Sequence, residues 1–199
     1  MLDADESRLE RQLDFARAID AEKQVRRMTH LTGHGRREND AEHAWHMTVM
    51  AYLLREYSNE PIDIGRTLIM CATHDLVEIY AGDTYAYDQE GQKTAHEREQ
   101  SAAERLFSLL PQDQEQDLRG IWEEFERNET AEARFAHAMD SVQPMMLNDA
   151  NGGADWRERK VSRDMPARRN AVTRLGSSTL ADYIDEMLDR HVEEGNLLP

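Results

Sequence analysis

Several features that define whole classes of protein are scarce in this sequence. It contains a single cysteine, Cys71, among 199 residues, so the chain has no internal disulfide framework, and this usage favours a reducing compartment. No apolar run approaches the length needed to span a bilayer, and residues 1–6 lack the basic and hydrophobic regions of a signal peptide. We therefore expect a cytoplasmic protein.

Basic residues are also few. The 24 lysines and arginines face 40 aspartates and glutamates, and the resulting net charge of -16 argues against nucleic-acid polymers and anionic membranes as partners. A small phosphorylated substrate stays compatible with this charge if a cation or local arginines receive it. The stretch 157–174 reverses the sign, and we expect its arginines to neutralise nearby carboxylates.

Strand-like alternation of useful length is missing, whereas helical periodicity is common. The predicted fold class is all-α, a helical bundle in one domain, 1–199. Within it we expect an N-terminal helix in 1–28, a core in 38–150, and a basic loop with a C-terminal helix in 151–199. The predicted helices cover about 7–27, 39–57, 62–80, 94–110, 112–127, 130–147 and 178–194. Loops are predicted at 28–37 and 148–155, each with two glycines.

The most informative stretch is 71–80, CATHDLVEIY. His74 and Asp75 stand side by side in an apolar run that predicts a buried helix, where charged groups are costly unless they are paired. A bound cation would supply that pairing. Glu78 lies one helical turn beyond His74, on the same face of the predicted helix.

Two further segments carry residues of the same kind. Asn39 followed by Glu42 predicts a capping box, which places His43 in the first turn of a helix. Further on, Asp140 adjoins an apolar stripe, and Pro144 cannot donate to its carbonyl, so a kink is expected there. Two imidazoles with two carboxylates suit a divalent metal ion such as Mn, Co, Zn, Mg, Fe or Ni.

The order histidine, histidine-aspartate, distant aspartate in a helical chain resembles the HD-domain metal-dependent phosphohydrolases. Two blocks, 36–43 (RRENDAEH) and 74–84 (HDLVEIYAGDT), are similar to the branch that contains 5'-deoxynucleotidases and HD domain-containing protein 2. The resemblance runs from about residue 25 to residue 195. A bare histidine-aspartate pair is weak evidence, but two extended blocks at this separation are specific.

The resemblance implies a role for each matched residue. Four residues would hold one divalent metal ion: His43, His74, Asp75 and Asp140. Glu78 and Asp83 would be catalytic, with Glu78 orienting or deprotonating a metal-activated water. Arg36 and Arg27 would bind the substrate phosphate.

The implied activity is that of a 5'-nucleotidase that releases phosphate from (deoxy)nucleoside 5'-monophosphates, in a homodimer. One departure weakens the nucleotide preference, because the arginine-x-glycine-tryptophan stretch of the nucleotidase relatives is not evident after Arg27.

Three alternatives remain open on the sequence. The same ligands would serve a phosphodiesterase or pyrophosphohydrolase of a signalling nucleotide. A two-iron oxidase needs additional histidines, and His96 is the only one between Asp75 and His137. The third alternative is a non-enzymatic module in which the metal only ties helices together.

Overall fold

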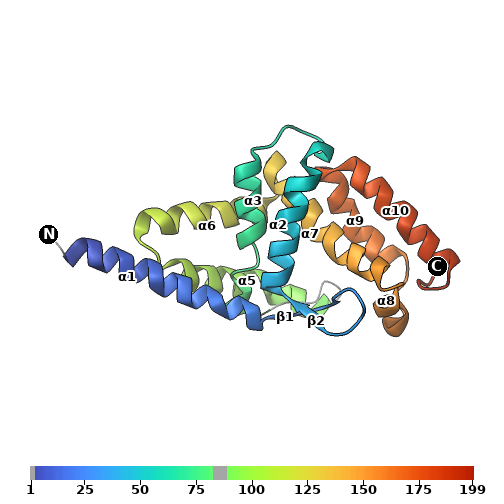
Figure 1. Cartoon of the computed structure of the whole chain (residues 1–199), viewed down its shortest axis with the longest axis horizontal. Coiled ribbons are helices and arrows are strands. Elements are labelled where there is room, and N and C mark those ends of the chain that lie inside the picture. Colours follow the sequence, from blue (N-terminus) through green and yellow to red (C-terminus); the bar gives the residue numbers. More distant parts are fainter. Residues whose placement is uncertain (1–2, 83–88) are drawn as a thin grey trace.

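The computed structural model describes residues 3–82 and 89–199, and their regular structure is almost entirely helical (Figure 1). The α-helices are α1 Asp3–Ala18, α2 Asp40–Leu54, α3 Ile64–Thr73, α4 Glu78–Ala81, α5 Gln89–Phe107, α6 Gln112–Arg127, α7 Ala131–Ala150, α8 Ala154–Arg159, α9 Asp164–Gly176 and α10 Ser178–Glu193. Short 3-10 helices cover Ile19–Gln24 and Arg55–Tyr57, and two strands, β1 Arg26–His30 and β2 Arg37–Asn39, form a small antiparallel sheet. The predicted all-α class is confirmed.

Helix α7 is the centre of the arrangement. It packs against α2, α3 and α6 and against α9 and α10, and Figure 1 shows it between the α2–α3 pair and the C-terminal helices. The main core surrounds it and includes Met47, Met70, Phe135, Met139 and Ile184. A second core joins α1, α5 and α6 through Phe15, Leu106, Phe107 and Trp122. Among the described residues, no helix has both the length and the apolar character that a membrane crossing requires.

Local signals placed several helix ends correctly. The predicted capping box is present, because the Asn39 side chain accepts from Glu42 N and the Glu42 carboxylate accepts from Asn39 N. Ser177 caps α10 by accepting from Leu180 N, and Gly82 ends α4 at a φ of 78°. These signals depend on neighbouring residues only, which is why the sequence shows them.

The predicted continuous helix over 62–80 is wrong. Helix α3 ends at Thr73, His74 is its carboxyl cap, and α4 begins only at Glu78. Tighter turns join them, with Leu76 N donating to Thr73 O (3.3 Å) and Glu78 N donating to Asp75 O (2.8 Å). Because the helix is interrupted at the charged pair, both polar side chains can turn towards one interior site.

The predicted N-terminal helix to residue 27 and the loop over 28–37 also need correction. Helical structure ends at Gln24, and β1 pairs with β2 so that Arg26 faces Asn39 and His30 faces Arg37. The strands are short and polar and show no apolar alternation, so periodicity could not reveal them. The predicted loop over 148–155 shrinks to residues 151–153, between α7 and α8.

Helices α7 and α9 approach closely at Gly176. A Cβ atom there would lie 2.1 Å from the Arg134 carbonyl oxygen and 2.9 Å from the Phe135 Cα. We predict that Gly176→Ala lowers the free energy of unfolding by about 1–3 kcal/mol, because the helices must move apart. Urea unfolding measures the difference.

The matched control for Gly176→Ala is Gly120→Ala in the interior of α6. An added Cβ there meets nothing within 4 Å, so we expect a gain of about 0.5–1 kcal/mol from helix propensity. Equal effects of the two substitutions would contradict the close contact of α7 with α9.

Candidate metal centre

The structure brings together the four side chains that the sequence singled out as metal ligands. His43 comes from the first turn of α2, His74 and Asp75 from the turn after α3, and Asp140 from α7. His43 Nε2 lies 3.1 Å from Asp140 Oδ1 and 3.9 Å from Asp75 Oδ2. His74 Nε2 lies 3.0 Å from Asp75 Oδ2 and 3.9 Å from Asp140 Oδ1. We call these four residues the metal centre.

The other ring nitrogen of each histidine determines its tautomer. His43 Nδ1 lies 2.9 Å from Gln143 Oε1, and the Gln143 amide nitrogen donates to Glu38 Oε2 (2.9 Å). The amide oxygen therefore faces His43 and accepts from its Nδ1–H. His74 Nδ1 lies 3.1 Å from the Cys71 carbonyl oxygen, which can only accept. When these rings are neutral, the Nε2 lone pair of each therefore points into the centre.

This arrangement fits a divalent cation. A bare Nε2 of His43 facing a carboxylate oxygen of Asp140 places two electron-rich atoms together, which is unfavourable unless a cation lies between them. His74 Nε2 is buried and has no hydrogen-bond partner among the groups that the structure describes. Two imidazole nitrogens and two carboxylates are a donor set typical of zinc, manganese, cobalt or iron.

The pKa values describe the same site without its cation. Burial lowers the pKa of His43, so this ring is neutral. Burial also opposes protonation of His74, but the Asp75 carboxylate outweighs it and raises the pKa of His74 to about 9. Although burial favours the neutral acids, the His74 charge holds the pKa of Asp75 low, and Arg169 does the same for the pKa of Asp140. Near pH 7 a proton on His74 therefore stands where a cation would bind.

Arg27 lies among the carboxylates, a position that the sequence did not predict. Its Nη1 donates to Asp75 Oδ2 (2.7 Å) and to Asp40 Oδ1 (3.1 Å), and Nη2 is 3.9 Å from Asp140 Oδ1. Burial disfavours the charged guanidinium, yet these carboxylates, Asp75 above all, raise the pKa of Arg27 well above its usual value. Arg27 is thus a buried counter-charge in this structure, and its contact with a phosphate stays a prediction.

Sequence reasoning missed the acids that surround this guanidinium. The side chains of Glu38 and Asp40 are 1% and 0% exposed, and burial is the main reason that the pKa of each rises to about 7. A hydrogen bond with Glu78 also affects the pKa of Asp40, so Glu78 lies next to one of the acids that surround Arg27. No sequence signal identifies these two acids, because an acid at a helix start is ordinarily solvated.

Arg169 is the second arginine at the site. Its Nη2 lies 3.2 Å from Asp140 Oδ2 and 3.4 Å from the Asp140 carbonyl oxygen. This carbonyl oxygen receives no helical hydrogen bond from residue 144, because proline has no N–H. Other arginines of the basic stretch pair with carboxylates in the same way, among them Arg163 with Asp189 and Arg174 with Asp182. The prediction that this stretch neutralises nearby carboxylates is confirmed.

The structure places Arg36 on the surface, and it does not describe Asp83. Arg36 is more than half exposed and pairs through two nitrogens with Glu42, the capping residue of α2. Arg36 thus forms a surface ion pair, whose contribution to stability is small, and its predicted contact with the substrate phosphate stays a prediction. Asp83 lies outside the described residues.

Metal affinity should rise with pH. The pKa of His74 is about 9 in the metal-free protein, so at lower pH a cation must displace this proton before it can bind. We expect the apparent association constant to increase about tenfold per pH unit well below the pKa of His74 and more slowly near it, which gives about 50-fold from pH 7 to pH 9. Calorimetric titration of the metal-stripped protein in buffers of different ionisation enthalpy measures both the affinity and the proton release.

The direction of this pH dependence follows from the linkage between proton binding and stability. A raised pKa stabilises the metal-free protein fully below pH 6.5, the ordinary value for histidine, and this contribution is lost as the pH rises through about 9. Metal binding should strengthen over the same window. An affinity that is flat between pH 7 and pH 9, with no proton released, would mean that His74 takes no part in binding.

Known proteins resemble this chain in sequence and in structure. The family model described as HD domain matches residues 19–179. The 5'-deoxynucleotidase HDDC2 of Bos taurus is 30% identical over 109 residues, 55% of this chain and 52% of that protein. The Homo sapiens protein of the same name is 28% identical over 135 residues, 67% of this chain and 65% of that protein. These matches span roughly half to two thirds of the relatives' length.

A solved structure covers more of the chain. The crystal structure of a predicted metal-dependent phosphohydrolase from Magnetospirillum magnetotacticum MS-1 is 44% identical, with a TM-score of 0.93. The match covers 98% of this chain and 97% of the other.

Proposed function

The chain belongs to the HD domain family and is an HD-type metal-dependent phosphohydrolase, and from this premise we propose that it is a 5'-nucleotidase. Its substrates would be nucleoside 5'-monophosphates, with deoxynucleotides preferred, and its product inorganic phosphate. The observation that carries the proposal is the convergence of His43, His74, Asp75 and Asp140, with both imidazole lone pairs directed inward.

His43, His74, Asp75 and Asp140 would hold a divalent cation, which would supply Lewis acidity for the phosphoryl group and for the attacking water. The neighbouring residues do the rest. Glu78, held beside Asp40, is placed to take the proton of the attacking water as general base. Water attacks phosphorus, the bond to the 5'-oxygen breaks, and the leaving 5'-oxygen receives the proton that Glu78 took from the water. Arg27 and Arg169 supply positive charge near the oxygens on which negative charge develops.

The position of Arg27 also suits the binding of an anion. The carboxylates around Arg27 carry more negative charge than its guanidinium neutralises. A bound cation would compensate part of that charge and so free some of the Arg27 N–H groups for other contacts. Its Nε is buried with no hydrogen-bond partner in the described chain, and a guanidinium is well suited to bidentate contact with phosphate. We propose that Arg27 binds the substrate phosphate once the cation is in place.

The nucleotide preference rests on the relatives. The curated relatives at 28–30% identity are 5'-deoxynucleotidases by name, and this supports a nucleoside monophosphate over other phosphate esters. The homodimer implied by the family resemblance stays a prediction. Exposed apolar side chains on one face of α2, namely Trp45, Val49, Tyr52 and Leu53, are where we expect its interface.

Phosphate release from a panel of nucleotides tests the proposed function. The metal-stripped protein is reloaded with Mn²⁺ or Co²⁺ and given ribo- and deoxynucleoside monophosphates, nucleoside diphosphates and triphosphates, cyclic nucleotides and dinucleoside pyrophosphates. We expect phosphate from the deoxynucleoside monophosphates, and none from the stripped protein. Turnover of only the diesters or pyrophosphates would instead favour the phosphodiesterase or pyrophosphohydrolase alternative.

A further inference from the structure

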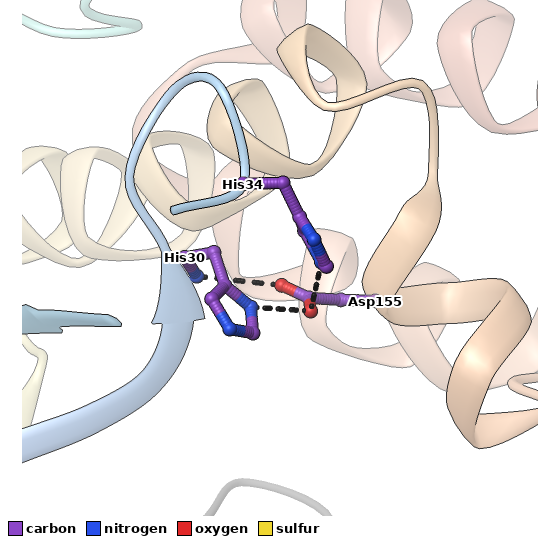
Figure 2. Close-up of side chains that lie close together, drawn as sticks. All are labelled: His30, His34 and Asp155. Atoms are coloured by element: carbon purple, nitrogen blue, oxygen red, sulfur yellow. Dashed lines mark hydrogen bonds and ion pairs between the residues drawn. The ribbon is translucent and has the colours of Figure 1, made fainter. Parts of the chain in front are cut away.

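A second group of metal-ligating side chains lies away from the metal centre, between the β1–β2 hairpin and α8 (Figure 2). It consists of His30 at the end of β1, His34 in the hairpin loop and Asp155 near the start of α8, and we call it the hairpin cluster. One ligand atom of each residue lies within 4.8 Å of the others. Figure 2 shows both imidazole rings directed at the carboxylate from the opposite element.

The two rings approach the same oxygen atom. His30 Nδ1 lies 2.6 Å and His34 Nε2 3.2 Å from Asp155 Oδ1, and the ring centroids are 4.2 Å apart. Asp155 is buried, with a side chain 8% exposed, whereas His34 is 30% exposed. The cluster therefore has a buried base and an open side through which an ion could enter.

The backbone around the cluster is held in place by Asn151. Its Oδ1 accepts from Gly33 N (2.9 Å) and His34 N (3.1 Å), and its Nδ2 donates to the carbonyl oxygens of His30 and Leu31. His34 has a φ of 55°, a left-handed conformation that is uncommon for histidine. Asn151 thus fixes the loop in the conformation that turns the His34 ring towards Asp155.

We propose that the hairpin cluster is a second divalent metal site, for an ion of the zinc class. Two imidazole nitrogens and one carboxylate oxygen suit Zn²⁺, Ni²⁺ or Cu²⁺ and disfavour Mg²⁺ and Ca²⁺, which prefer oxygen ligands. Glu158 Oε1 lies 3.9 Å from His34 Nε2 on the exposed side and would serve as a fourth ligand. The alternative for the same contacts is a cluster of hydrogen bonds and ion pairs that needs no metal.

An ion at this site would tie the hairpin to α8. The hairpin also carries Arg27 and Glu38, whose side chains enter the metal centre. Occupancy of the hairpin cluster would therefore stabilise the strand that positions Arg27, and the expected role of the ion is structural. With Glu158 as fourth ligand the site would be closed, as structural zinc sites are, so no second reaction is proposed.

Zinc stoichiometry tests the proposal. The metal-stripped protein is dialysed against a fixed concentration of free Zn²⁺, and bound zinc is measured by mass spectrometry. We expect two zinc ions per chain in the wild type and one in His34→Asn. Asparagine is chosen because it tolerates the left-handed backbone of residue 34. Thr32→Ala, an exposed residue in the same loop, is the matched control and should keep both ions.

A measurement on the wild-type chain keeps the test independent of the variant's folding. Nitrogen-15 resonances of the labelled imidazoles should shift at His30 Nδ1 and His34 Nε2 when Zn²⁺ is added, and should stay unchanged with Mg²⁺. Equal zinc content in wild type and His34→Asn, or resonances of both rings that do not respond to Zn²⁺, would leave only a hydrogen-bonded cluster and overturn the proposal.

Discussion

Glu78→Gln should lower kcat by about 10²–10⁴-fold and leave the metal content unchanged. Glutamine keeps the shape of the side chain and its hydrogen bond to Asp40 but cannot take a proton from water. Because Glu78 is not among the four proposed ligands, the cation should remain bound. Steady-state turnover of a deoxynucleoside monophosphate, measured together with metal content and thermal unfolding, separates loss of chemistry from loss of metal or fold.

The matched control for Glu78→Gln is Glu123→Gln on α6. Glu123 pairs with Arg119 on a partly exposed surface, so the same exchange of acid for amide should leave turnover unchanged there. Full turnover in Glu78→Gln, with metal and fold intact, would remove Glu78 from the proton-transfer step. The proposed metal centre would survive this outcome, because it depends on other residues.

Arg27→Met should destabilise the metal-free protein by about 3–5 kcal/mol, because it leaves buried carboxylates without their counter-charge. The Arg27 side chain is 11% exposed and lies between Asp40, Asp75 and Asp140. Methionine retains the apolar stem but provides no positive charge. Saturating divalent metal should recover part of the lost stability, since a cation bound to the folded state neutralises the same carboxylates.

Arg26→Met is the matched control for this prediction. Arg26 is the neighbouring residue on β1 and is exposed, so its replacement should change the free energy of unfolding by less than about 0.5 kcal/mol. Denaturant unfolding with and without Mn²⁺ gives all four values. If Arg27→Met and Arg26→Met unfold alike without metal, the carboxylates do not need Arg27. Equal stability with and without Mn²⁺ in Arg27→Met would show that the cation does not replace its charge.

The two predictions probe different properties of one site. Arg27 and the cation both compensate surplus negative charge, so their effects on stability should overlap and not simply add. Glu78 acts on a proton, so its effect should appear in kcat alone. A variant with both substitutions should therefore show the stability of Arg27→Met and a turnover no higher than that of Glu78→Gln.

Candidate metal ligands and helix caps that depend only on neighbouring residues could be predicted from the sequence. His74 and Asp75 stand out because charged neighbours are rare in an apolar run, and the Asn39–Glu42 capping box placed His43 at a helix start. The helical class and most helix positions followed from periodicity. The break between α3 and α4 did not, because apolar residues on both sides of His74 and Asp75 continue the helical pattern while the backbone leaves it.

Only the tertiary structure decided which polar residues share a site. Arg27 and Arg169 belong to segments more than 100 residues apart, yet both reach Asp140, and the hairpin cluster joins positions 30, 34 and 155. Residue type and spacing report the interactions of a helix with itself, but the distance between segments depends on how the whole chain packs. The sequence therefore determined which groups can bind a metal ion, and the packing of α2, α3 and α7 determined which of them meet.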